Sequence, residues 1–181
     1  MCLVRFMKIQ MIKKLGIVSC LAVACAVVSP SVVRAQNNAG FILFGGIKDS
    51  ALDYCLDNGG SGRNDRYYLE VKPQKFKVSE VIITYPEHFN GSFDTSEMKL
   101  RVTDQCRGGK DLEIESATWD KETRRITIIP KEEIPSKTAI RAVLSNVRNP
   151  DYSGFYQLDG RVMRADIPVP QYIGSWVITL D

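Results

Sequence analysis

Few residues of this sequence have the types and the spacing that catalysis requires. His88 is the only histidine, so a Ser-His-Asp or Cys-His site would have to include it. It lies in residues 85–91, a stretch with proline and glycine that predicts a solvent-exposed loop. A general base also needs a neighbour that orients it, and no partner for His88 stands at a recognisable spacing. The sequence therefore predicts no catalytic residues, and we expect a protein that is not an enzyme.

Two polar stretches leave other chemistry open. Glu113 and Glu115 could serve as the carboxylate pair of a polysaccharide-active enzyme, but their alternation with apolar residues predicts the wet face of a strand. Residues 57–65 are rich in Asp, Asn and Gly, whose oxygen atoms could bind calcium. Acids are sparse there and Arg63 disfavours a cation, so a flexible turn is the better interpretation. The single histidine and two distant cysteines exclude a zinc cluster, and we expect no metal or cofactor.

Aromatic residues provide one further alternative. A platform on which a sugar stacks could be built from Tyr67, Tyr68, Tyr152, Phe155 and Tyr156. Packing in the core explains most of these side chains better, so we assign them no ligand.

The beginning of the chain is typical of an exported protein. Residues 1–35 contain five basic residues and no acid, and 15–28 are apolar or small apart from one serine. Small or apolar residues precede Gln36 at the positions a signal peptidase reads, which predicts cleavage between Ala35 and Gln36. An uncleaved anchor is the alternative, but the apolar run is shorter than the ~20 residues a membrane span needs. A lipoprotein modified at Cys25 is a second alternative.

Removal of residues 1–35 changes the charge of the protein. The whole chain has a net charge of +3, but the part after residue 35 holds 19 basic and 21 acidic residues. No basic surface is left to attract nucleic acid or an anionic membrane. We expect a periplasmic or extracellular protein without a stable membrane span, whose partner is an envelope component or a protein of unknown identity.

Two cysteines follow the predicted cleavage site. Cys55 and Cys106 form an even pair in a compartment where disulfides persist, and we predict that they are bonded. Each stands near the end of a predicted strand, where two Cα atoms can approach to the roughly 4.4–6.8 Å that a disulfide requires. The alternative is two unpaired thiols, one of them packed as a small apolar residue.

Short segments of alternating apolar and polar residues recur along residues 36–181. They predict strands around residues 41–44, 52–54, 67–71, 81–85, 100–102, 112–119, 124–129, 140–144 and 176–180. Turn residues separate these segments, with Gly108 and Gly109 in one hairpin and residues 120–123 in another. The apolar phase slips within residues 112–119, which predicts a β-bulge near Glu115 or Ser116.

This pattern predicts one all-β domain over residues 36–181, folded as an antiparallel β-sandwich or barrel. No convincing helix follows the signal peptide, apart from one short turn at residues 94–98. Both tryptophans lie after Cys106, whereas an antibody-type domain places one between its cysteines. A sandwich of immunoglobulin-like type would therefore not be of the antibody kind.

Four stretches resemble an exported cyanobacterial family of unknown function, domain of unknown function 2808. They are Phe44-Gly45-Gly46-Ile47, Asp65-Arg66-Tyr67-Tyr68-Leu69, Leu144-Ser145-Asn146-Val147-Arg148-Asn149-Pro150 and Tyr172-Ile173-Gly174-Ser175-Trp176. The resemblance covers roughly residues 41–180, and residues 119–149 also look like a bacterial Ig-like domain. It implies an immunoglobulin-like sandwich and supplies no catalytic residues. We expect Asn146, Arg148 and Asn149 to fasten a turn to neighbouring backbone.

These observations favour an exported, non-enzymatic binding or structural module of the cell envelope. An extracytoplasmic, carboxylate-dependent enzyme acting on polysaccharide is the first alternative. An assembly protein that pairs through an exposed edge strand is the second, with residues 41–44 as the candidate edge.

Overall fold

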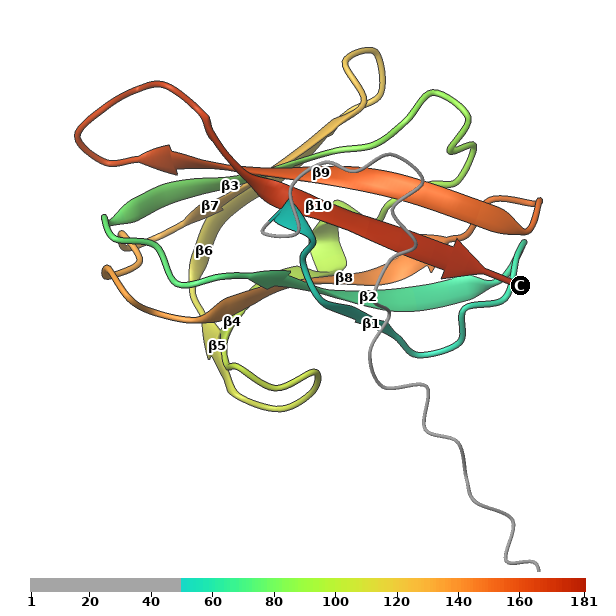
Figure 1. Ribbon diagram of the computed structural model, residues 1–181, viewed down its shortest axis with the longest axis horizontal. Helices are drawn as coiled ribbons and strands as arrows, with labels where there is room; N and C mark the ends of the chain where they lie inside the picture. The colour runs from blue at the N-terminus through green and yellow to red at the C-terminus, as the bar shows by residue number, and fades with distance from the viewer. Residues whose placement is uncertain (1–49) are drawn as a thin grey trace, which may run out of the picture. The chain divides into compact units, whose positions relative to one another are not determined.

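The computed structural model describes residues 50–181, which form two facing layers of β-strands (Figure 1). The predicted cleavage site at Ala35 and Gln36 and the predicted strand at residues 41–44 lie outside the described residues. A short 3₁₀ helix, Thr95–Glu97, stands where one helical turn was predicted. The strands are β1 (Tyr54–Leu56), β2 (Asn64–Val71), β3 (Val78–Thr84), β4 (Met98–Val102), β5 (Lys110–Leu112), β6 (Ile114–Asp120), β7 (Arg125–Pro130), β8 (Ile140–Arg148), β9 (Gly154–Arg164) and β10 (Gln171–Leu180).

Each layer is an antiparallel sheet of five strands. Sheet I has the order β1-β2-β8-β4-β5, and sheet II has the order β10-β9-β3-β7-β6. Consecutive strands such as β2 and β3, or β7 and β8, belong to different sheets, so the chain crosses repeatedly between the layers. Such crossing connections are typical of immunoglobulin-like sandwiches. The predicted all-β, antiparallel, immunoglobulin-like sandwich is confirmed.

The core lies between the sheets and is built from alternate residues of each strand. In β2, Tyr67 and Leu69 are fully buried, and in β3 Val81 and Ile83 are fully buried. Because successive side chains of a strand point to opposite faces, this period of two places one face of each strand in the core. Burial raises the pKa of the Tyr67 hydroxyl, so the group keeps its proton. The hydroxyl donates that proton in a hydrogen bond to Asn149 Oδ1 (2.7 Å).

Trp176 of β10 links the two sheets. Its ring is fully buried, and its indole Nε1 donates a hydrogen bond to the backbone carbonyl of Glu70 in sheet I (2.9 Å). Gly160 on the neighbouring strand β9 makes room for the ring, because a Cβ at that position would lie 2.6 Å from Trp176 Cη2. The buried position of the Trp176 ring therefore requires a residue without a side chain at position 160 of β9.

Strand β9 is absent from the sequence prediction. Its buried residues Tyr156, Leu158 and Val162 keep the period of two, but Gly160 interrupts the apolar series in the middle. A glycine inside an apolar series usually weakens a strand, which hides the pattern. The predicted strand at 52–54 is also displaced: β1 begins at Tyr54, while Leu52 packs in the core and donates its N–H to the Ser175 carbonyl (2.9 Å).

The predicted β-bulge is confirmed, with a register shift between Ile114 and Ser116 where β6 pairs with β7. Glu113 and Glu115 are both exposed, as their alternation with apolar residues predicts, but they do not belong to one strand. β5 belongs to sheet I and β6 to sheet II, so Glu113 lies on the connection between them. Its carboxylate accepts a hydrogen bond from Lys131 Nζ (2.7 Å) in solvent. The two glutamates therefore do not form a carboxylate pair in a cleft.

The predicted disulfide between Cys55 and Cys106 is present, and its Cα atoms are 6.0 Å apart. It fastens the connection between β4 and β5, residues 103–109, across the outer face of sheet I; we call this segment the strap (Figure 1). Cys55 pairs with Tyr68 across β1 and β2, so both side chains lie on that outer face. Arg107 of the strap lies over the Tyr68 ring, 5.8 Å from its centroid, and forms an ion pair with Asp57 (2.8 Å).

The described residues contain no helix that is long and apolar enough to cross a membrane.

Candidate functional site

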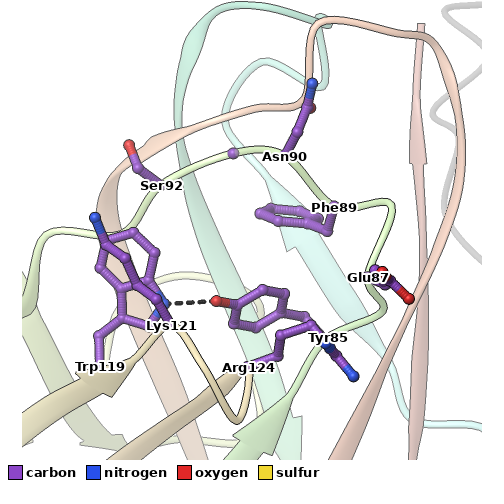
Figure 2. Close-up of a pocket in the computed structure, with 9 residues that line it drawn as sticks. Tyr85, Glu87, Phe89, Asn90, Ser92, Trp119, Lys121 and Arg124 are labelled. Carbon is purple, nitrogen blue, oxygen red and sulfur yellow. Dashed lines mark hydrogen bonds between the residues drawn. The ribbon is translucent and has the colours of Figure 1, made fainter.

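An open pocket of about 340 Å³ lies at one end of the sandwich, where β3 ends and β6 turns into β7 (Figure 2). Ligand sites in proteins commonly have volumes of about 300–1,000 Å³. Aromatic residues lie at its base, and charged and polar residues surround its mouth. It is lined by Tyr85, Glu87, Phe89, Asn90, Gly91, Ser92, Trp119, Lys121 and Arg124.

One wall of the pocket is the loop after β3, residues 85–92. The loop closes on itself through a hydrogen bond from the Phe89 N–H to the Pro86 carbonyl (3.0 Å). Ser92 exchanges two backbone hydrogen bonds with Arg148 of β8 (3.0 and 2.9 Å), which anchors the end of the loop. Gly91 lies so close to the Arg148 carbonyl that a Cβ would collide with it. The loop is therefore attached to both sheets.

The opposite wall is the turn between β6 and β7. Asp120 Oδ1 accepts hydrogen bonds from the backbone N–H groups of Glu122 (2.9 Å) and Thr123 (3.1 Å), and the Thr123 hydroxyl donates to Oδ2 (2.6 Å). These bonds, led by the one from the Thr123 hydroxyl, lower the pKa of the Asp120 carboxyl. The turn closes with Arg124 at a φ of 52°. It thereby holds Lys121 and Arg124 on the pocket side.

A hydrogen bond joins the two walls at the base of the pocket. Trp119 Nε1 donates to the Tyr85 hydroxyl oxygen (2.8 Å), as the dashed line in Figure 2 shows. Because that oxygen acts as the acceptor, the Tyr85 O–H can donate to another group. Phe93 meets Trp119 edge to face, with ring centroids 5.5 Å apart, and Lys121 Nζ lies 4.4 Å from the centroid of the Trp119 ring. The indole is thus fixed by contacts on several sides.

The mouth of the pocket has an excess of positive charge. Lys121 and Arg124 are exposed cations, and Glu87 is the one carboxylate among the lining residues. Neither cation takes part in an ion pair within residues 50–181. Positively charged donors that form no ion pair within the protein remain available to an anionic ligand.

His88 lies next to this pocket but does not line it. The side chain is exposed, as the sequence predicts, and its ring stacks on Tyr156 with centroids 5.3 Å apart. Within residues 50–181, the imidazole of His88 contacts the Tyr156 ring and forms no hydrogen bond to a nucleophile or to an orienting carboxylate.

The Gly-rich stretch at residues 57–65 forms a turn in which backbone N–H groups bind the Asp65 carboxylate. The Asp65 carboxylate is buried and accepts hydrogen bonds from the N–H groups of Asp57, Asn58, Gly59 and Arg66 at 2.7–3.0 Å. Its oxygens are therefore occupied by donors, and the stretch connects β1 to β2 as the predicted turn. Within residues 50–181, no group of three or more His, Cys, Asp or Glu side chains is arranged to hold a metal ion.

The five aromatic residues considered as a sugar platform do not share a surface. Tyr67 is in the core, Tyr68 lies under the strap on the outer face of sheet I, and Tyr156 is buried in the core. Tyr152 and Phe155 are exposed, with 76% and 70% of their surfaces accessible. The preference for core packing holds for Tyr67 and Tyr156, while Tyr68 is buried under the strap, so these five residues do not form a single platform.

The turn-fastening role expected for three residues is clearest at Asn149. This buried side chain donates to the Gly60 carbonyl (2.8 Å) and to the Asp65 carboxylate (3.2 Å). Asn146 adopts a positive φ of 54° and donates to Asp94 Oδ2 (3.3 Å). Arg148 acts mainly through its backbone pairing with Ser92.

Sequence reasoning did not find the pocket residues Tyr85, Trp119, Lys121 and Arg124. Tyr85 and Trp119 were assigned to strands, and the 120–123 turn was treated only as a connection. The available signal was the pairing of an Asp-initiated turn directly after Trp119 with a loop rich in aromatic residues. Their proximity depends on β3 and β6 flanking β7 in one sheet, which sequence periodicity does not reveal.

The pocket has the groups for non-covalent binding. It offers hydroxyl and cationic donors over an aromatic base, together with one carboxylate acceptor. Its lining residues include neither a cysteine nor a histidine.

Comparison with solved structures finds several proteins at low sequence identity. The bacterial hydrophobin BslA is 11% identical, with a TM-score of 0.48, covering 73% of this chain and 98% of BslA. A Nocardia farcinica protein with an immunoglobulin-like fold is 10% identical, with a TM-score of 0.41, and the match covers 72% of this chain and 97% of the Nocardia chain. The collagen-binding domain of a Staphylococcus aureus adhesin is 10% identical, with a TM-score of 0.39, covering 71% and 95%.

No curated protein matches the sequence. A family model described as "Protein of unknown function (DUF2808)" matches residues 41–180, almost all of the chain after the predicted signal peptide. This range contains all four of the stretches that resemble the family, and the chain belongs to the DUF2808 family.

Proposed function

We propose that this protein is a non-enzymatic binding module of the cell envelope and that it takes its ligand in the pocket between the 85–92 loop and the 120–124 turn. The observation that supports this most directly is the pair Lys121 and Arg124. Both are exposed at the mouth of a pocket, held there by an ordered turn, and left without ion pairs within the described residues. Ordered polar groups at a concave surface are what a binding site requires.

Two features are consistent with export and so support the envelope location. The Cys55–Cys106 disulfide belongs to oxidising compartments, and residues 1–35 have the composition of a signal peptide. In this proposal the working protein begins at Gln36. Sequencing the N-terminus of protein recovered from the periplasm or the medium tests this: a form beginning at Cys25 would indicate a lipoprotein, and an intact leader would indicate an anchor.

A binding experiment tests the function itself. The purified protein is incubated with separated envelope fractions, namely polysaccharide, membrane and protein, and the bound amount is measured. We expect one fraction to bind, and Trp119→Ala to weaken this binding at least tenfold because it removes the base of the pocket. Tyr172→Ala is the matched control, since this exposed aromatic side chain lies on β10 and does not line the pocket.

Thermal unfolding of each variant separates lost binding from lost folding. Binding that survives Trp119→Ala in a folded protein would place the ligand elsewhere. Release of new reducing ends from the polysaccharide fraction would favour the enzymatic alternative instead.

A further inference from the structure

We propose that the pocket recognises the acid groups of an anionic polysaccharide, through Lys121, Arg124 and the hydroxyl of Tyr85. This inference rests on the binding function proposed above and names the chemical class of the ligand.

The donors of the pocket favour an anion. Lys121 and Arg124 supply charged donors, and the Tyr85 O–H is free to donate because its oxygen already accepts from Trp119 Nε1 (2.8 Å). Charged donors form shorter and stronger hydrogen bonds with anionic oxygens than with neutral ones. A carboxylate or sulfate group would therefore be preferred over a neutral hydroxyl at this position.

The position of Lys121 argues against a neutral sugar stacked on Trp119. Its ammonium group lies 4.4 Å from the centroid of the indole ring, and Phe93 contacts the same ring edge to face. A sugar ring stacking on the indole would have to displace the ammonium and its cation–π interaction. An acid group meets the ammonium where it already lies, and Figure 2 shows Lys121 in front of the indole.

The rim of the pocket favours a polysaccharide over an acidic peptide. Glu87 repels the carboxylates of either polymer, but it accepts hydrogen bonds from hydroxyl groups, which a polysaccharide carries and a chain of acidic amino acids lacks. Ser92 and Asn90 are exposed at the same rim and can pair with groups that both donate and accept. A sugar acid combines an anionic group with several hydroxyls, which matches both halves of this arrangement.

Non-specific attraction does not account for such binding. The chain after residue 35 has more acidic than basic residues, so a polyanion is not drawn to the protein as a whole. Recognition would therefore depend on the local cations, and single substitutions in the pocket should reveal it.

Isothermal titration calorimetry of the purified protein with defined polymers provides the test. The acidic probes are an oligogalacturonate and a dextran sulfate, and their neutral counterparts are the methyl-esterified oligogalacturonate and dextran. We expect at least one acidic polymer to bind tenfold or more tightly than its neutral counterpart, and this affinity to fall as salt screens the charges. Which acid binds separates carboxylate from sulfate recognition.

Charge-removing variants connect the affinity with the pocket. Lys121→Gln and Arg124→Gln should each weaken binding of the acidic polymer about three- to tenfold, as expected for exposed charged hydrogen bonds. Lys75→Gln removes the same charge from an exposed residue in the connection that leads into the opposite end of β3, and it should leave the affinity unchanged.

Equal binding of acidic and neutral polymers, or unchanged affinity in both pocket variants, overturns the inference. Equally tight binding of poly-glutamate would replace the polysaccharide with an acidic peptide. If no polymer binds while an envelope fraction still binds in a Trp119-dependent manner, the binding function stands and only this ligand class falls.

Discussion

Arg141 is a buried cation whose hydrogen-bonding groups are not satisfied within the sandwich. It lies on β8 between Glu70 of β2 and Arg101 of β4, and only 5% of its surface is accessible. Its Nε and Nη1 atoms are buried without a hydrogen-bond partner. Burial lowers the pKa of the guanidinium, although Glu70 and two further carboxylates oppose this effect. A buried charge without good partners costs stability.

Replacing this charge should therefore stabilise the protein. We expect Arg141→Met, which keeps most of the aliphatic length, to raise the free energy of unfolding by about 1–2 kcal/mol. Urea unfolding followed by tryptophan fluorescence measures the change. Arg148→Met is the control, because its guanidinium is exposed and makes a 3.5 Å ion pair with Asp151, and it should change stability by less than about 0.5 kcal/mol. A loss of stability in Arg141→Met would show that unseen partners satisfy the guanidinium.

At the scale of elements, one close contact sets how β9 and β10 lie against the core. Trp176 fills the space above Gly160, and a Cβ on that glycine would lie 2.6 Å from Cη2 and 3.0 Å from Cζ3 of the ring. The ring cannot move away freely, because it is fully buried and its Nε1 is held by the Glu70 carbonyl.

Gly160→Ala should lower the free energy of unfolding by about 1–3 kcal/mol, the usual cost of overpacking a core. Gly60→Ala serves as the comparison, since the nearest atom there belongs to the flexible side chain of Arg63. Chemical denaturation of both variants gives the difference. Equal effects of the two substitutions would contradict the proposed role of the Gly160–Trp176 contact.

The strap is the second element whose position depends on one feature, the disulfide. Cys55 and Cys106 are separated by 51 residues, and closing a loop of this length stabilises a fold by about 4 kcal/mol in the chain-entropy model. The bond also holds Arg107 over Tyr68, which is buried although it lies on an outer face.

Reduction of the disulfide should therefore lower the free energy of unfolding by about 2–4 kcal/mol. It should also increase hydrogen exchange in residues 103–109 before that in the core strands, because the strap loses its attachment. Hydrogen exchange with mass spectrometry on oxidised and reduced protein compares the two. Protection of the strap that is the same in both forms would show that the Arg107–Asp57 pair alone holds it.

The elements that the sequence predicts well are those with a clear local signal. The period of two in residues 67–71 and 81–85 corresponds to β2 and β3. The Gly108–Gly109 turn corresponds to the β4–β5 hairpin, and the phase slip at Glu115 corresponds to the bulge in β6. β9 was not predicted because Gly160 interrupts its apolar pattern. The glycine is required by the close contact with Trp176, a residue 16 positions away. The disulfide was predictable because only two cysteines follow the predicted cleavage site.

The pocket was not predictable for a different reason. Its residues come from two connections and from the end of β6, which are brought together by the order β3-β7-β6 within sheet II. Periodicity indicates that these strands exist, but it does not say which of them are neighbours. A binding site built from loops at one end of a sandwich therefore needs the topology before its residues can be grouped.

At the scale of the whole molecule, both sheets depend on pairing between distant segments. β2 pairs with β8 from Asn64↔Arg148 to Val71↔Ile140, and β3 pairs with β9 from Val78↔Arg164 to Thr84↔Asp159. Neither central pair can form as a local hairpin. The local hairpins are β1–β2 and β4–β5 in sheet I and β6–β7 and β9–β10 in sheet II, so each sheet needs distant pairs to join its two hairpins.

This topology predicts slow folding. The entropy of closing long loops must be lost before the β2–β8 and β3–β9 contacts stabilise the chain, so we expect refolding of the oxidised protein in about milliseconds to seconds. Stopped-flow tryptophan fluorescence after dilution from denaturant measures the rate, because Trp176 becomes buried only when sheet II packs on sheet I. Brief unfolding before each measurement limits the slow phases that proline isomerisation adds. Folding within microseconds would mean that local hairpins, and not the distant strand pairs, determine the barrier. Substitutions in β8, which pairs with both β2 and β4 in sheet I, should then leave the folding rate unchanged.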